Sequence, residues 1–263
     1  MTHTFRTAAV AGLFYPDDAA ELRALLQELL ATNPATGASP KAVIAPHAGY
    51  IYSGPIAARA YNRLTQQAHE IRRVLLLGPA HRVAVRGMAL PSVDAFCTPL
   101  GEVPLDHEAI ALIENLPQVE RSDVAHRLEH SLEVHLPFLQ TLLDSFMLVP
   151  LVVGWALPQE VAQVLETLWG GTETLVVISS DLSHYHPYDT AQRLDKETAH
   201  CIETRQTPIQ DTQACGAYPI NGLLTVAQKR NLAIQRLDLR NSGDTAGDRA
   251  RVVGYGAWAL YDN

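Results

Sequence analysis

The stretch KAVIAPHAGYIYSG, residues 41–54, predicts a buried strand that ends in a functional group. Its small and apolar residues Ala42–Ala45 read as the strand, and the chain then turns at Pro46 and presents His47. The pattern returns in VLLLGPAH, residues 74–81, which ends at His81. A strand that simply turned would more often end in Gly, Asn or Asp, so two imidazoles at such positions indicate chemistry.

Continuous apolar runs alternate with amphipathic segments along the whole chain, which is typical of a mainly parallel sheet covered on both faces. We therefore expect a single α/β domain over residues 1–263, with a mainly parallel or mixed central sheet and helices on both faces. Residues 84–103 mix short apolar pieces with Gly and Pro and predict strands and turns. The expected strands are 42–45, 73–77, 147–153, 174–179 and 251–261, and the expected helices are 17–31, 54–66, 104–116, 130–145, 158–169, 188–205 and 219–229.

Composition excludes several classes of protein. The net charge is -8 with no basic stripe, which argues against a nucleic-acid surface. No segment approaches eighteen consecutive apolar residues, so we expect no membrane span. The cysteines Cys97, Cys201 and Cys215 form no CxxC motif and lie far apart, as in a protein of the reducing cytoplasm.

Titratable side chains follow the ends of three predicted strands. Besides His47 and His81, the segment TLVVISSDLSHYH, residues 174–186, places Asp181 and His184 just past a strand. Ligands of such sheets bind at the carboxyl ends of the strands, and imidazole is a common metal ligand. The sequence thus predicts a metal site with His47 and His81 as ligands. The third ligand stays open among Cys215, Asp181, Glu129 and His184, and the alternative is that the two histidines only cap turns.

Cys215 precedes a predicted helix, because Pro219 of ACGAYPINGLL suits a first helical turn. A thiol at a helix N-terminus has a lowered pKa and favours the thiolate, which is a nucleophile or a soft metal ligand. The alternative is a buried small hydrophobic residue, and this is the interpretation we favour for Cys97 and Cys201.

The segment LEHSLEVHLPFL, residues 128–139, carries Glu129, His130 and Glu133 at spacings that share one helical face. Such a group would act in acid–base chemistry or orient metal-bound imidazoles; the alternative is a solvated helix face. Serine hydrolysis is disfavoured because Ser179 and Ser180 lack the Gly-x-Ser-x-Gly elbow. The segment NSGDTAGD, residues 241–248, lacks the Lys-Ser/Thr of a phosphate-binding loop.

Seven segments together resemble the Memo family, whose prokaryotic members are named as component B of the AmmeMemoRadiSam system. They occur in the family's order, from residue 11 into the closing predicted strand. The segments are AGLFYPDD, APHAGYIYSG, LLGPAH, EHSLEVHLPFL, SSDLSHY, CGAYPI and NSGD…RVVGYGA.

The resemblance implies a fold like that of the class III extradiol dioxygenases, which hold a non-haem iron by two histidines and a carboxylate. In Memo-like proteins the two histidines correspond to His47 and His81, a cysteine corresponding to Cys215 replaces the carboxylate, and His184 matches the acid–base histidine. The metal implied is iron or copper. AMMECR-like and radical SAM proteins are the implied functional associates.

Two functions remain open at this stage. One is a metal-dependent redox enzyme acting on an unidentified small molecule, with His184 as general acid–base and Asp181 orienting it. Tyr50, Glu129 and His130 would line its pocket. The other is a non-catalytic binding module that uses the same cleft for a peptide or protein partner.

Overall fold

Four parallel strands form the middle of the sheet in the computed structural model, which describes residues 3–32 and 38–262. Their order is β2 (Ala42–Ala45), β9 (Thr174–Ser179), β3 (Arg73–Pro79) and β8 (Met147–Val153). Almost every side chain of these strands is buried, because helices cover both faces of the sheet. The predicted strands 42–45, 147–153 and 174–179 are confirmed residue for residue.

Antiparallel strands extend this core at both edges, so the sheet is mixed, as predicted. On one side β12 (Val252–Tyr261) pairs with β2 and carries β10 (His184–His186) and β11 (Ala233–Asn241). On the other side β4 (Met88–Leu90) pairs antiparallel with β8 and parallel with β7 (Val119–Arg121). A separate small sheet joins β1 (Phe5–Arg6), β5 (Ala95–Thr98) and β6 (Gly101–Pro104), which confirms strands within residues 84–103.

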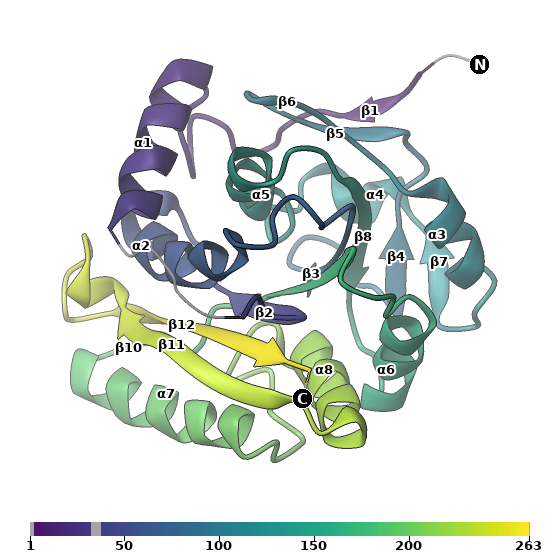
Figure 1. Cartoon of the computed structure of the whole chain (residues 1–263). Coiled ribbons are helices and arrows are strands. Elements are labelled where there is room, and N and C mark those ends of the chain that lie inside the picture. Colours follow the sequence, from purple (N-terminus) through teal and green to yellow (C-terminus); the bar gives the residue numbers. More distant parts are fainter. Residues whose placement is uncertain (1–2, 33–37, 263) are drawn as a thin grey trace.

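Helices cover both faces of the central sheet (Figure 1). One face carries α1 (Ala19–Ala31), α2 (Tyr50–Tyr61) and α5 (Leu136–Leu142), and the other carries α6 (Pro158–Thr167), α7 (Tyr188–Glu203) and α8 (Ala217–Arg230). Shorter helical pieces are η1 (Asn62–Leu64), α3 (His107–Ile113), α4 (Asp123–Arg127), η2 (Glu133–His135) and η3 (Ser242–Asp244). Among the residues with a described structure, no helix combines the length and the apolar character that crossing a bilayer requires.

Two helices begin at other residues than the sequence predicted. The helix expected at 130–145 begins only at Leu136, and Pro137 occupies its first turn, where no backbone donor is needed. The helix expected at 54–66 already begins at Tyr50 and accommodates Pro55. Strand β11 was missed because its charged residues hide the alternation, which a bulge between Arg236 and Asp238 also interrupts.

Asp195 of α7 is a buried carboxyl that supports the turn into β10. It is 2% exposed, and its Oδ1 accepts a hydrogen bond of 3.0 Å from the backbone N–H of Ser183. It also lies directly against Gly254 of β12, where an added Cβ would come within 2.1 Å of Oδ2. Burial raises the pKa of Asp195 to about 6.

This raised pKa predicts a pH dependence of stability. Between pH ~4 and ~6 the folded protein holds a proton on Asp195 that the unfolded chain has lost, so the free energy of unfolding falls as pH rises. Asp195→Asn should remove a fall on the order of 3 kcal/mol over this window. Urea unfolding at pH 4 to 8 measures it. Asp189→Asn, an exposed site on the same helix, is the control, and an equal slope in both variants would contradict the prediction.

Candidate metal site at the carboxyl edge of the sheet

Three imidazoles meet beyond the carboxyl ends of β2 and β3. The ring centroids of His47 and His81 are 5.1 Å apart. The ring centroid of His130 lies 5.4 Å from that of His47 and 4.8 Å from that of His81. One ring nitrogen of each histidine lies within 4.8 Å of the others, which is close enough for a shared metal ion. The two strand-end histidines therefore converge as expected, and the third member of the group is His130.

His47 is held in the tautomer that a metal ligand needs. Its Nδ1 lies 2.6 Å from Ser179 Oγ, and the Ser179 hydroxyl itself donates to the carbonyl of Ser131 at 2.6 Å. Because that hydroxyl hydrogen is used, Nδ1 must be the donor and carry the imidazole proton. Nε2 of His47 is thus the unprotonated nitrogen, the form in which a histidine binds a metal.

Glu129 fixes His81 in the same way. Its Oε1 accepts from His81 Nδ1 at 2.9 Å, and its Oε2 accepts from the His81 backbone N–H at 2.6 Å. The backbone N–H groups of His130 and Ser131 also donate to Oε1. Burial by itself raises the pKa of Glu129, but the hydrogen bonds and charge of His81 outweigh it, and the pKa falls to about 2. The carboxylate therefore holds a proton of His81 on Nδ1, so that Nε2 is the nitrogen that carries the lone pair when the ring is neutral.

His130 packs between the ring of Phe14, at 4.9 Å, and the ring of His81. Its Nδ1 is buried without a hydrogen bond and lies 3.4 Å from Glu129 Oε1. Burial lowers the pKa of His130 to about 4, and burial lowers the pKa of His47 well below its usual value. Both rings are therefore neutral at physiological pH, the form that binds metals.

Cys215 contacts this cluster through His47. Its Sγ lies 3.4 Å from His47 Nε2 and accepts from the backbone N–H of Asp181 at 3.3 Å. It is not a member of the three-histidine group defined above. The expectation of a lowered thiol pKa is wrong. Although the thiol precedes α8, burial raises the pKa of Cys215, since the loss of hydration disfavours the thiolate more than the helix start favours it.

Asp181 faces His47 in the structure, whereas the sequence reading had it orient His184. Its Oδ1 accepts from the His47 backbone N–H at 2.9 Å, and its Oδ2 lies 3.9 Å from His47 Nε2. No hydrogen bond within the described residues joins Asp181 to His184, because β10 turns away to pair with β12. Burial raises the pKa of Asp181 to about 7, and burial lowers the pKa of His184.

These groups border a cleft of about 810 Å³. Its lining includes His47, His81, His130, Asp181, His184 and Tyr255. Tyr50, expected in the pocket, lies elsewhere: it is 3% exposed and donates to the carbonyl of Val134 at 2.6 Å. Tyr52 lines the cleft in its place, because α2 begins at Tyr50 and turns that side chain into the core. Glu129 stands behind His81 and outside the lining.

Glu129 and Glu133 do not share a helical face, since regular helix begins only at Leu136. Glu133 is fully buried and pairs with Arg6 at 2.7 Å. It also accepts from Tyr15 Oη and from the backbone N–H groups of Ala9 and Val10. Its role is to fix the N-terminal segment that carries Phe14 to the edge of the cleft.

Comparisons with known proteins identify the family of the chain. The profile of the Memo-like protein family matches residues 6–259. The chain belongs to this family. The MEMO1 family protein of Aquifex aeolicus is 36% identical over 266 residues, covering 95% of this chain and 97% of its own. Those of Methanothermobacter thermautotrophicus and Archaeoglobus fulgidus are 36% and 35% identical, each covering 95% of this chain and 98% and 97% of their own lengths.

Sequence reasoning missed several residues of this Memo-like site. Ser179 and Ser131, which fix His47, were weighed only as part of a hydrolase or not at all. The segment 241–248, set aside as a phosphate loop, supplies Ser242, Gly247 and Asp248 to the cleft wall. Tyr255 comes from the closing strand. The signal that could have found Ser179 is its place at the end of the apolar run 174–179, the same kind of position that drew attention to the residues after the other strands.

Replacing Glu129 tests whether His81 is a ligand. Glu129→Gln removes the carboxylate that orients His81, and the affinity for Fe²⁺ should fall by about 10- to 100-fold. Anaerobic calorimetric titration of the metal-free protein measures this. Glu120→Gln, at an exposed glutamate, is the matched control and should change nothing. Equal affinities in the two variants would show that His81 takes no part in binding.

Proposed function

We propose that this protein binds iron or copper through His47, His81 and Cys215 and uses the ion in a redox reaction on a small molecule held in the cleft. The observation that carries the proposal is the preset state of the two strand-end histidines. Each has its Nδ1 proton engaged by a buried partner, Ser179 or Glu129, so that Nε2 is the nitrogen available to a metal in each neutral ring. Turn capping alone would not require both free lone pairs to converge with a third imidazole.

The charge states favour a metal over a cysteine nucleophile. Burial raises the pKa of Cys215 and lowers the pKa of its neighbour His47, so the uncharged thiol–imidazole pair is much the more stable form. A cysteine nucleophile needs the opposite shifts. A metal ion can instead displace the thiol proton as it binds. Two imidazoles and a thiolate form a set that suits copper as well as iron.

The remaining polar groups suit proton transfer. His184 lines the cleft, and its lowered pKa leaves its ring neutral and able to accept a proton from a bound molecule. Asp181, with a pKa of about 7, can hold or release a proton near neutral pH. A bound ion would supply the electron exchange that these side chains lack. The mixed sheet with its cleft at the carboxyl edge supports a dioxygenase-like fold. We propose a catechol-like or thiol compound as the substrate.

The third ligand can be identified by counting protons. At pH 8, replacement of the Cys215 proton by Fe²⁺ should release about one more proton per ion in the wild type than in Cys215→Ser. Calorimetry in buffers of different ionisation enthalpy gives this number. Cys201→Ser, at a cysteine outside the cleft, should behave as the wild type. Equal release in all three proteins would leave His130 as the third ligand.

Ligand and proton carrier should separate by mutation. His184→Ala should keep its metal and lose about 10²- to 10⁴-fold in turnover, whereas His81→Ala should lose the metal first. Metal per chain and oxygen uptake with a panel of catechols and low-mass thiols measure the two effects. His200→Ala, exposed on α7, is the control. If His184→Ala loses metal as fully as His81→Ala, His184 is itself a ligand.

The rim of the cleft favours a second candidate function, the binding of a peptide or protein partner. Leu13, Ile51 and Tyr185 are 80%, 68% and 62% exposed, and all three border the cleft. A partner would first be isolated with the wild-type protein, and its binding to two variants would then be measured. Binding that persists in metal-free His81→Ala but is lost in Ile51→Asp would support this function over catalysis.

A further inference from the structure

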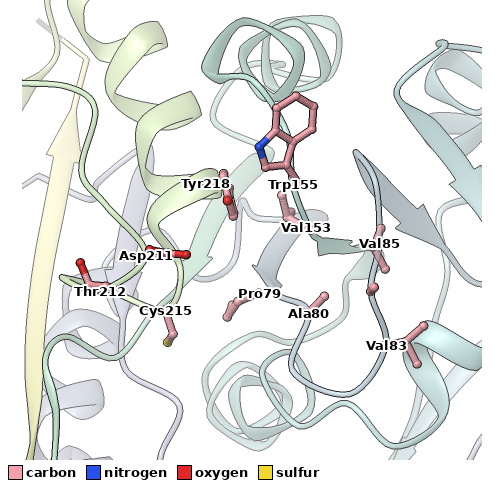
Figure 2. A pocket seen from close by; sticks show the side chains of 12 residues that line it. Pro79, Ala80, Val83, Val85, Val153, Trp155, Asp211, Thr212, Cys215 and Tyr218 are labelled. Carbon is pink, nitrogen blue, oxygen red and sulfur yellow. The ribbon is translucent and has the colours of Figure 1, made fainter.

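A second cavity of about 560 Å³ lies beside the cleft and shares none of its lining residues (Figure 2). It is formed where β3 and β8 end and α8 begins. Its volume is within the range of small-molecule sites. Figure 2 shows Cys215 on one side, Pro79 and Ala80 beneath, Val83 and Val85 opposite, and Trp155 and Tyr218 at the far end.

One loop separates the two spaces. Pro79, Ala80 and residues 83–85 line the second cavity, whereas the intervening His81 and Arg82 line the histidine cleft. Cys215 lines only the second cavity, yet its Sγ lies 3.4 Å from Nε2 of His47, a residue of the cleft. The Cys215 sulfur thus lies between the second cavity and His47.

The chemistry of the lining selects the kind of ligand. Most of the lining side chains are apolar, and Asp211 is the one charged residue in it. The guanidinium of Arg86 lies 5.8 Å from the centroid of the Trp155 ring, at the end of the cavity away from Cys215. Trp155 is 53% exposed and offers an aromatic surface to an occupant. These features fit an uncharged, largely apolar molecule.

We propose that this cavity is a second ligand site, which takes a small uncharged apolar molecule and leads it to the Cys215 sulfur from the side away from the histidines. A molecule that enters from the Trp155 side would then reach the thiol without passing through the histidine cleft. The proposal requires no bound metal, so it stands or falls apart from the redox function proposed above.

Thiol labelling of metal-free protein tests the site in a Cys97→Ser, Cys201→Ser background, where Cys215 is the remaining cysteine. Benzyl methanethiosulfonate is the uncharged apolar probe, and its 2-sulfonatoethyl analogue is the anionic one. In each reaction the thiol proton goes to buffer, the Cys215 sulfur forms a disulfide with the probe's thio sulfur, and methanesulfinate leaves. After division by each probe's rate with glutathione, the benzyl probe should react at least about tenfold faster.

Two tryptophan substitutions locate the entrance. Ala84→Trp fills the second cavity from an exposed position and should slow benzyl labelling at least about tenfold. Ile51→Trp crowds the histidine cleft and should leave the rate unchanged. Far-UV circular dichroism confirms folding, and Thr212→Trp, also exposed in the cavity lining, serves if Ala84→Trp does not fold. Slowing by Ile51→Trp alone, no benzyl labelling of Cys215, or equal normalised rates for the two probes would each overturn the proposal.

Discussion

The carboxylate of Glu129 is the constraint on which the site depends. It is 2% exposed and accepts four hydrogen bonds, from the ring and backbone of His81 and from the backbone N–H groups of His130 and Ser131. One anion thus fixes the ring of one histidine and the backbone of the next. Ser131 extends the constraint, because its hydroxyl donates to the carbonyl of Pro79 and its own carbonyl receives the Ser179 hydroxyl. Gly78 permits this close approach, since an added Cβ would lie 2.8 Å from Ser131 Oγ.

A second buried carboxylate, Glu133, fixes the N-terminal segment at the edge of the cleft. It pairs with Arg6 and accepts from the N-terminal backbone, so the segment that carries Phe14 packs on His130. Arg6 has further partners in the carbonyls of His126 and Glu129. A buried pair with every polar atom engaged is costly to break from one side, by about 3–5 kcal/mol. The two glutamates of one short segment thereby join the N-terminus, the end of β3 and the histidine cluster.

Burial also decides the charges in the site. The same loss of hydration keeps His47 and His130 neutral, keeps the Cys215 thiol protonated and raises the pKa of Asp181 to about 7. Glu129 escapes this trend because its hydrogen bonds and the charge of His81 outweigh burial. As a result His47, His130 and Cys215 are uncharged, while Glu129 is an anion paired with His81. An activated thiol would require the opposite arrangement.

The sequence by itself determined the parallel core and the placing of His47 and His81 at its carboxyl edge. These signals are local: a continuous apolar run predicts a strand buried on both faces, and the strand's end fixes where the next side chain lies. Only the tertiary structure decided that Glu129 and Glu133 support different parts of the site and that Asp181 faces His47. It also decided that Tyr52 and Tyr255 rather than Tyr50 line the cleft, and that the thiol of Cys215 stays protonated. Each of these depends on contacts between residues far apart in the chain and on the depth of burial. Neither quantity is written in the spacing of residues along one segment.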